Sequence, residues 1–482
     1  MALLKAILKN QIFWYLVSKY IVLGLQFIAA IFLAIKLGSF QFGIWSFFVL
    51  LVTIGSSFNF GVGHSLLILL VQNKENKEKS NNYIINSLFL AACTAIFPIL
   101  IVLVNLFIPI PVFEKYRIGN FIYAAVAIIA LLYLLAPLAN VMRVNNKITQ
   151  LSIQQVFWPL TMVIAVFCAT DYKLLVVLVA GYLISSIVSF VFLLMQLNIE
   201  LKLKINVGMC KELIEKGFYL FLYNTGFALI MLSTKFLISR SYSVEEFGCF
   251  SFAFSVALGV MSLVDAINFF IFPKLIDVQK SNEPLKIRKS ITFLRSNYLL
   301  LLHFSLYCII PVGILFFDMV PKFQFSLVPF FLILHTFYIL INSIGYSSYL
   351  LATNKEKLYS LLVIVTLMLN LIFVSVAIVV FKCSFGYVIL GTMLSYFIYS
   401  CAINCIVLYY LGERRLDIYL RETVFNKLFV FSLFSVSIFL FANNRWILLS
   451  LPLLFSLINL KSLKQMTHTM FRIIKCNRLL KI

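Results

Sequence analysis

Charged residues are scarce in this chain, at 12% of its 482 residues, and acidic ones are the scarcer kind, with 17 Asp and Glu against 39 Lys and Arg. Hydrophobic residues make up 63% of the sequence. A soluble globular domain usually carries about 25% charged residues, so this composition excludes one. The chain therefore belongs in surroundings that are themselves apolar.

The sequence also lacks the signatures of common catalytic and metal-binding proteins. It has no Gly-x-x-x-x-Gly-Lys phosphate loop, no Gly-x-Ser-x-Gly nucleophile elbow and no His-Glu-x-x-His zinc motif. Only four histidines occur, and the nine cysteines show no metal-ligand spacing. No polar stretch is long enough to form a soluble catalytic domain. We therefore expect no enzymatic activity, no cofactor and no metal site.

Long apolar runs recur along the whole chain, and each is long enough to cross the hydrocarbon core of a bilayer, which takes about 20 residues of helix. The runs are continuous and not alternating, which favours helices over a β-barrel. We therefore predict an all-α integral membrane protein with about 14 transmembrane helices. The predicted spans lie near 11–35, 42–71, 83–108, 119–142, 150–170, 174–197, 217–239, 246–276, 294–317, 324–351, 358–381, 385–411, 424–442 and 446–461.

The basic residues indicate the orientation of the chain. If the N-terminus is cytoplasmic, roughly three quarters of the Lys and Arg residues fall on inner loops and tails, as the positive-inside rule requires. Lys36 and Lys115 are among the few that fall on outer loops. An even number of spans then places both termini on the cytoplasmic side. Since the charge is spread over short inner segments, it reflects topology and not nucleic-acid binding.

An internal repeat relates the two halves of the chain at a shift of about 205 residues. A Phe-Gly pair followed by an aromatic residue and Ser-Phe occurs at Phe42-Gly43 and again at Phe247-Gly248. A second repeated motif follows in the same order: the Asn-Asn-Lys of 145–147 matches the Thr-Asn-Lys of 353–355. Duplicated halves in a membrane chain are typical of transporters that rock two lobes about a central site.

The repeat predicts the domain organisation. Residues 1–197 form an N-terminal lobe of six spans, 198–216 a cytoplasmic connector, 217–411 a C-terminal lobe of six spans, and 412–482 two further spans with a basic cytoplasmic tail. Because each lobe has an even number of helices, both enter the membrane from the same side. The pseudo-twofold axis that relates them then lies along the membrane normal.

Ionisable residues inside the spans are candidates for a functional site, because a charge in the bilayer is costly. Lys19 lies within the first run on a polar stripe with Gln26, and Lys235 shares a face of the seventh run with Asn224. Asp265 lies deep in the eighth run. The alternatives are snorkelling of the lysines to the near interface and a purely structural partner for the carboxylate.

The second and eighth runs have the polar, interrupted composition that often marks a transport site. Glycine and serine cluster around Asn59 and His64 in the second run, and Asp265 is followed by Asn268 and Pro273 in the eighth. Close helix packing through small residues is the alternative interpretation. The candidate substrate-facing residues are Lys19, Gln26, Asn59, His64, Asn224, Lys235, Asp265 and Asn268.

With these motifs the chain resembles the Wzx-type polysaccharide flippases, a family of the multidrug, oligosaccharidyl-lipid and polysaccharide exporter superfamily. In that family a basic residue and a short turn with Phe-Gly join the first two helices of each lobe, and a Phe-Pro pair ends the eighth helix. One departure is Thr234 before Lys235, where many relatives carry an acidic residue. The matching positions here are Lys36, Leu37, Gly38, Phe42 and Gly43, then Arg240, Phe247, Gly248 and Pro273.

The resemblance implies a flippase of the bacterial inner membrane. Its substrate would be a polyprenyl-pyrophosphate-linked oligosaccharide repeat unit, moved from the cytoplasmic to the outer leaflet by alternating access for O-antigen, as part of lipopolysaccharide, or for another surface polysaccharide. The implied partners are the lipid bilayer, H⁺ or Na⁺ as a coupling ion, and a polysaccharide polymerase with its chain-length machinery, but no nucleic acid.

Two alternative functions are a cation-coupled small-molecule or multidrug exporter of the same superfamily and a polysaccharide polymerase. Two lysines against one aspartate inside the spans favour an anionic substrate over the cationic drugs of many exporters. The absence of a large outer loop disfavours a polymerase.

Overall fold

The computed structural model describes residues 11–170, 173–197, 205–279, 283–441 and 445–466, and of these only the backbone at 11–19, 263–278 and 445–446. The chain divides into two compact units, Met1–Gly259 (unit 1) and Val260–Ile482 (unit 2). The described residues are helices and loops, without a strand, as the sequence predicts. The lobe boundaries at 197 and 217 remain a prediction from the repeat.

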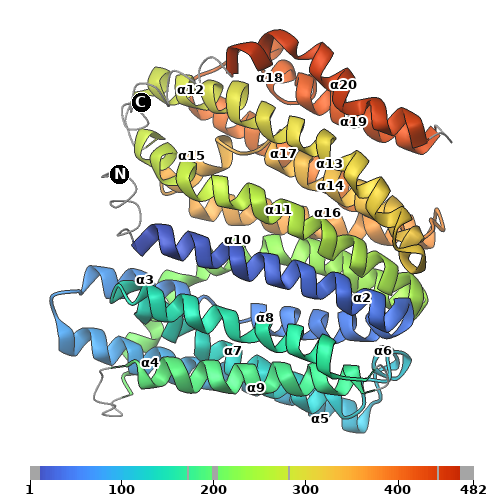
Figure 1. Ribbon diagram of the computed structural model, residues 1–482. Helices are drawn as coiled ribbons and strands as arrows, with labels where there is room; N and C mark the ends of the chain where they lie inside the picture. Colours follow the sequence, from blue (N-terminus) through green and yellow to red (C-terminus); the bar gives the residue numbers. More distant parts are fainter. Residues whose placement is uncertain (1–10, 171–172, 198–204, 280–282, 442–444, 467–482) are drawn as a thin grey trace, which may run out of the picture. The chain divides into compact units, whose positions relative to one another are not determined.

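The helices of unit 1, coloured blue to green in Figure 1, are α2 (Gln11–Ser57), α3 (Val62–Gln72), α4 (Lys77–Thr94), α5 (Ile96–Phe107), α6 (Pro111–Lys115), α7 (Phe121–Val144), α8 (Ile148–Cys168), α9 (Leu174–Met195), α10 (Val207–Ser241) and the first part of α11 (Val244–Gln279).

Unit 2 holds the rest of α11, then α12 (Pro284–Phe293), the π-helical turn η1 (Leu294–Leu299), α13 (Leu300–Asp318), the short 3-10 helix η2 (Pro321–Ser326), α14 (Leu327–Ile341), α15 (Tyr346–Ala352), α16 (Glu356–Val379), α17 (Ile389–Tyr410), α18 (Leu416–Glu422), α19 (Lys427–Phe441) and α20 (Arg445–Ile458).

Among the described residues, 11 helices are long and apolar enough to cross a membrane, or up to 13 if each of two bent helix pairs is one span. The first of them, Tyr20–Ser57, combines the predicted first span with part of the second. The join is Gly38, whose φ of 71° and ψ of 175° interrupt the helix. The sequence-based count of about 14 spans counts those two runs separately, and it remains a prediction.

Unit 1 is built around α7, α8 and α9, and α2 packs on α7 and α8. Trp158 of α8 links two neighbours, because its ring stacks on Tyr182 of α9 at 4.1 Å and tilts against Trp45 of α2 at 5.9 Å. Lys36 closes the free end of α8, since its ammonium donates to the carbonyls of Val166 and Ala169, both at 2.7 Å. A cation counted from the sequence as a marker of topology thus caps a helix C-terminus, where the dipole favours positive charge.

In unit 2 the last two helices pack against the preceding ones. α20 contacts α13, and α19 contacts α14. Tyr307 of α13 is the centre of this packing, with ring centroids 4.9 Å from both Phe431 of α19 and Phe455 of α20. Its hydroxyl lies 3.2 Å from Ser432 Oγ, so the buried phenol has a polar partner. The two helices α19 and α20, where the sequence predicts two further spans, are therefore an integral part of unit 2.

The two copies of the Asn-Lys motif have the same backbone conformation. Asn146 and Asn354 both have a φ of 56°, the left-handed region that Asn tolerates at a helix C-terminus. The next amide closes the same turn in each copy: Lys147 N donates to Met142 O and Lys355 N to Leu350 O, both at 2.8 Å. The repeat seen in the sequence is thus a repeat of local structure.

The Phe-Gly turns reverse the chain by different means. In the first copy the reversal depends on Gly38 and its positive φ. In the second copy, Ser243 and Glu246 form a capping box: Ser243 Oγ accepts from Glu246 N at 3.2 Å, and Glu246 Oε2 accepts from Ser243 N at 2.9 Å. Only the first copy therefore needs a glycine at the turn itself.

The two Phe-Gly turns pack directly on each other within unit 1. A methyl group added at Gly43 would overlap the carbonyl oxygen of Val244, and one added at Gly248 would overlap that of Ser39. The two contacts are equivalent, because the repeat that relates Gly43 to Gly248 also relates Ser39 to Val244. We call Phe42, Gly43, Phe47, Phe247, Gly248 and Phe252 the turn cluster.

The aromatic contacts of the turn cluster obey the same symmetry. Phe42 meets Phe252 at 5.8 Å and Phe47 meets Phe247 at 6.3 Å, both edge to face. The repeat converts the first of these pairs into the second, and such a reciprocal contact is typical of two segments related by a twofold axis. The pseudo-twofold relation predicted from the sequence therefore holds for these two turns.

Candidate functional site

The predicted interruption of the second helix is confirmed at residues 58–61, between α2 and α3. Phe60 and Gly61 have φ values of 49° and 74°, and Asn59 Oδ1 accepts from Gly61 N at 3.0 Å. At this break α3 and α10 come together backbone to backbone. A methyl group at Gly61 would lie 2.5 Å from Gly217 O, and one at Gly217 would lie 2.6 Å from Gly61 O.

Polar side chains of neighbouring helices hydrogen-bond the carbonyl groups around this break. Tyr133 of α7 donates to Gly55 O at 2.6 Å, Thr225 of α10 to Ser57 O at 3.3 Å, and Asn140 of α7 to Gly63 O at 2.7 Å. Irregular backbone at membrane depth is tolerated only when such partners satisfy it. We did not single out these partners from the sequence, although Tyr133 and Asn140 stand out as polar groups in the apolar run of α7.

Three exposed polar residues from three helices are found around the break. His64 lies on the first turn of α3, Arg143 near the end of α7, and Asn224 on α10 beside the Thr225 that bonds to Ser57. Arg143 Nη1 donates to Asn140 Oδ1 at 3.2 Å, so Asn140 joins the cation to the broken segment. This break site (Asn59, His64, Asn140, Arg143 and Asn224) presents hydrogen-bonding groups and a cation, which suits the binding of a polar or anionic ligand.

Lys235 lies apart from the open part of this surface. Its side chain on α10 is only 8% exposed, and the ammonium lies over the rings of Phe254 and Phe247 at 4.7 and 5.9 Å. Within the described part of the chain, no carboxylate forms an ion pair with it. Cation–π attraction to two rings thus holds a cation that the sequence predicts to face a substrate.

Of the remaining predicted residues, Gln26 alone has a described side chain, and no described contact joins it to the break. Gln26 is half-buried on α2. Lys19, Asp265 and Asn268 lie where side chains are outside the described residues. The predicted interruption of the eighth helix is wrong, since α11 runs unbroken from Val244 to Gln279 and includes Pro273. A long helix absorbs a proline when neighbouring groups serve the freed carbonyl, so a Pro alone does not imply a break.

The loop cations Lys115 and Lys36 both cap helix ends. Lys115 donates to the carbonyls of Ser239 and Arg240 at 2.8 and 3.3 Å, and also to that of Tyr242, at the end of α10. Burial lowers the pKa of Lys115. Beside it Tyr116 donates to Ser239 O at 2.9 Å and stacks on Phe47 at 4.1 Å. Arg240 of the family motif is exposed, and its carbonyl makes the contact.

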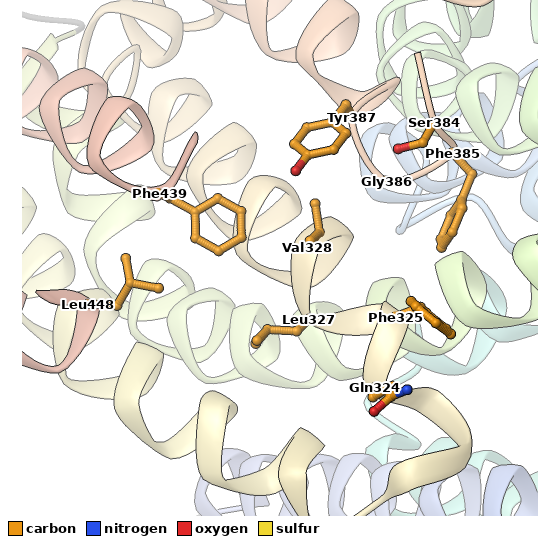
Figure 2. Close-up of a pocket in the computed structure, with 10 residues that line it drawn as sticks. All are labelled: Gln324, Phe325, Leu327, Val328, Ser384, Phe385, Gly386, Tyr387, Phe439 and Leu448. Atoms are coloured by element: carbon orange, nitrogen blue, oxygen red, sulfur yellow. The ribbon is translucent and has the colours of Figure 1, made fainter. Parts of the chain in front are cut away.

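Unit 2 contains a cavity of about 520 Å³ between η2, the loop before α17, and the helices α19 and α20. Figure 2 shows the aromatic rings of Tyr387, Phe385, Phe325 and Phe439 around Val328. Gln324 and Ser384 supply polar groups to the lining. A cavity lined by rings with a few polar groups suits an amphipathic ligand. Nothing in the sequence analysis pointed to it.

Comparison with known proteins identifies the family and the fold of the chain. A family model described as polysaccharide biosynthesis protein matches residues 32–323. No curated protein matches the sequence.

Two solved structures with the same fold are a lipid II flippase, MurJ, in an inward closed conformation, and a multidrug resistance MATE transporter of the MOP superfamily in an inward-facing one. The flippase has a TM-score of 0.67 at 13% identity over 95% of this chain and 99% of its own. The MATE transporter has a TM-score of 0.65 at 13% identity over 82% and 94%. With its all-helical, multi-pass architecture and paired turns, the chain belongs to the polysaccharide biosynthesis protein family and has the fold of the MOP superfamily of transporters.

Proposed function

We propose that the protein is a flippase that moves a polyprenyl-pyrophosphate-linked oligosaccharide repeat unit from the cytoplasmic to the outer leaflet. The family and the transporter fold support movement of a polysaccharide precursor in place of its chemical conversion. The observation that carries the proposal is the reciprocal contact of the two Phe-Gly turns, together with the broken, polar second helix. A contact between two copies of one motif is an element that two rocking lobes can make and break.

The side chains of the break site suit this substrate. A pyrophosphate needs cations and directed donors, and the sugar needs hydroxyl-binding amides. Arg143 and His64 offer the first, and Asn224 and Asn59 the second. Lys19 and Lys235 add positive charge on the first and seventh predicted spans. The polyprenyl tail remains in the bilayer throughout.

The setting is the bacterial inner membrane with both termini in the cytoplasm, as the distribution of Lys and Arg supports. H⁺ or Na⁺ acting through Asp265 is the candidate coupling ion. A polysaccharide polymerase with its chain-length machinery is the expected consumer of the product, whether O-antigen or another surface glycan. Removal of the product on the outer side helps to pull the reaction forward by mass action.

The test is a strain that lacks this gene, in which lipid-linked sugars are extracted and the leaflet that holds them is assayed. Intact lipid-linked units trapped on the cytoplasmic side are the expected result, and their mass identifies the sugar. Units that reach the outer face but stay unpolymerised would indicate a polymerase instead. Unchanged lipid-linked sugars would favour the second candidate, a small-molecule exporter, which the equally close fold of the MATE transporter supports.

Lys235→Met provides a test of the buried cation. If the ammonium contributes to binding in part of the cycle, export falls about tenfold, the worth of one charge-assisted contact. The unfolding midpoint stays the same or rises, because the apolar replacement removes a buried charge. Complementation of the deletion strain measures export, and thermal unfolding of the purified protein measures stability.

The matched control is Lys211→Met, the same change at an exposed position of the same helix, where only a surface pair with Glu215 at 3.7 Å is lost. Both variants are expected at wild-type membrane levels. Normal export by Lys235→Met would assign Lys235 to packing alone.

A further inference from the structure

Unit 2 has a second, polar cavity of about 720 Å³ at the other end of the helices that border the aromatic one. It lies where η1 leads into α13, beside the bend between α18 and α19 and beyond the end of α20. Along α19, Phe439 lines the first cavity and Lys427 the second, 12 residues apart, which at ~1.5 Å per residue is roughly 18 Å. We call it the α19 pocket.

The α19 pocket carries an excess of positive charge. Arg295, Arg421 and Lys427 line it together with one carboxylate, Glu422. That carboxylate is already engaged, since Arg295 Nε lies 3.2 Å from Glu422 Oε2. Arg421 and Lys427 are exposed, and within the described ranges no carboxylate lies at ion-pair distance from either. Two cations are therefore open to an anionic ligand.

Backbone features of the pocket favour the same kind of ligand. Lys427 is the first residue of α19, a helix of 15 residues whose N-terminal end carries partial positive charge. Asn426 caps that end, because its Oδ1 accepts from Leu428 N at 3.0 Å and so takes up one of the N–H groups of the first turn. The π-helical turn η1 brings Asn297 to the pocket on the opposite wall, and such turns are common at functional sites.

The apolar surroundings show how the anion is presented. Directly beyond the pocket, Leu433 and Phe434 of α19 and Leu453 and Leu457 of α20 are exposed, the last two at 70% each. Exposed apolar side chains on a membrane helix pair face lipid chains. An anion held at the end of such a pair, with an apolar chain along the helices, is the headgroup of a lipid.

We propose that the α19 pocket binds the phosphate-bearing headgroup of a lipid in the cytoplasmic leaflet, with its chain along α19 and α20. Arg421 and Lys427 hold the phosphate, and the amides of Asn297 and Gln465 contact its substituents. Two lipids share this chemistry, an isoprenoid diphosphate and an anionic phospholipid of the bilayer. Identifying the ligand with the isoprenoid diphosphate rests on the proposed function, whereas phosphate recognition does not.

The test measures binding to the full-length protein in nanodiscs of uncharged lipid. The probes are a long-chain isoprenoid diphosphate, the corresponding isoprenoid alcohol, and phosphatidylglycerol, each followed by native mass spectrometry. The double variant R421Q/K427Q is expected to weaken diphosphate binding about tenfold or more, because each juxtamembrane cation contributes roughly 1 kcal/mol. The isoprenoid alcohol, which lacks the diphosphate, is expected to bind the wild-type protein no better than the diphosphate binds the double variant.

The control is K286Q/K289Q, which removes two exposed cations from α12 outside the pocket and is expected to leave binding within about twofold. Equal binding of phosphatidylglycerol would support the site and assign it to bilayer lipid. Binding of the diphosphate by R421Q/K427Q at wild-type strength, or equal binding of the alcohol, would overturn the proposal. Since the deletion strain tests transport without these variants, failure of the pocket and failure of the proposed function are distinguishable.

Discussion

Gly248→Ala is expected to lower export about fivefold or more, and Gly43→Ala to do the same. Each added methyl group overlaps a backbone carbonyl of the opposite turn, and a backbone atom cannot move aside as a flexible side chain does. Overpacking of this kind costs about 1–3 kcal/mol. If the turns separate during the cycle, that cost falls only on the state in which they are joined. The equilibrium between joined and separated turns then shifts by roughly 5- to 150-fold.

The equilibrium between joined and separated turns can also be measured directly, independently of export. In a background in which all nine native cysteines are replaced by serine, a cysteine placed at the buried Ser46, one helical turn from Gly43, reports whether the turns are joined. Labelling of this cysteine by a membrane-impermeant reagent is expected to rise in Gly43→Ala and in Gly248→Ala. Gly24→Ala is the control, since nothing lies within 4 Å of a methyl group at that position. Wild-type export and labelling in both cluster variants would show that the turn contact has no part in transport.

The turns also show what a single sequence reveals and what it leaves out. Because both copies keep Phe-Gly at one spacing, the repeat and its pseudo-twofold relation were predictable from Gly43 and Gly248. The packing of the two copies on each other was not predictable, because a repeat shows that two segments are equivalent and does not show that they touch. The different chemistry of the reversals, Gly38 in one and the Ser243 capping box in the other, depends on local residues outside the shared motif.

The broken second helix was predictable for a similar reason, and the eighth helix shows the limit. Asn59 and Gly61 belong to a run of residues that favour turns, and the helix does end there. A proline was the weaker signal, since α11 continues through Pro273. The partners of the break, such as Tyr133 and Asn140, were not predictable, because helix pairing decides which polar groups meet.

Charges were the least predictable features of the chain. Lys36 and Lys115 were assigned to outer loops from the sequence, Lys36 also to the family motif, and each caps a helix in the structure. Lys235 was a candidate to face a substrate, and its ammonium lies over two aromatic rings. In each case the partner is a carbonyl or a ring from a distant segment. Such partners carry no formal charge, so a search for opposite charges misses them.

Arg295→Ala is expected to destabilise the protein by about 3 kcal/mol, the range for removing one partner of a buried ion pair. The Arg295 side chain is 8% exposed, and its guanidinium joins three segments of unit 2. It donates to Asn342 O at 2.8 Å and to Glu422 O at 3.3 Å, it pairs with the Glu422 carboxylate, and it lies over the Tyr346 ring at 5.1 Å. Its loss leaves the Asn342 carbonyl without the guanidinium donor, and Glu422 with the more distant Tyr346 hydroxyl at 3.5 Å, in a partly dry site.

Arg288→Ala is the comparison in which the cation is the exposed partner. Arg288 also forms an ion pair, with Glu413 at 2.8 Å, but the Arg288 side chain is 41% exposed and the Glu413 side chain 7%. Glu413 keeps other donors, because it accepts from the backbone N–H groups of Arg415 and Arg414, both at 3.0 Å, and these contacts lower its pKa. The expected cost of Arg288→Ala is about 1 kcal/mol, because the buried carboxylate that remains is still hydrogen-bonded.

The two variants are compared by thermal and denaturant unfolding of the purified protein, together with membrane levels in cells. Arg295→Lys is expected to fall between them, since an ammonium cannot donate to the carboxylate and the carbonyls in the planar geometry of guanidinium. Equal midpoints for Arg295→Ala and Arg288→Ala would contradict the assignment of Arg295 as the polar centre of unit 2. A larger loss in Arg295→Ala would mean that a cation hidden in an inner segment is needed to hold α13, α18 and the end of α14 together before any substrate is bound.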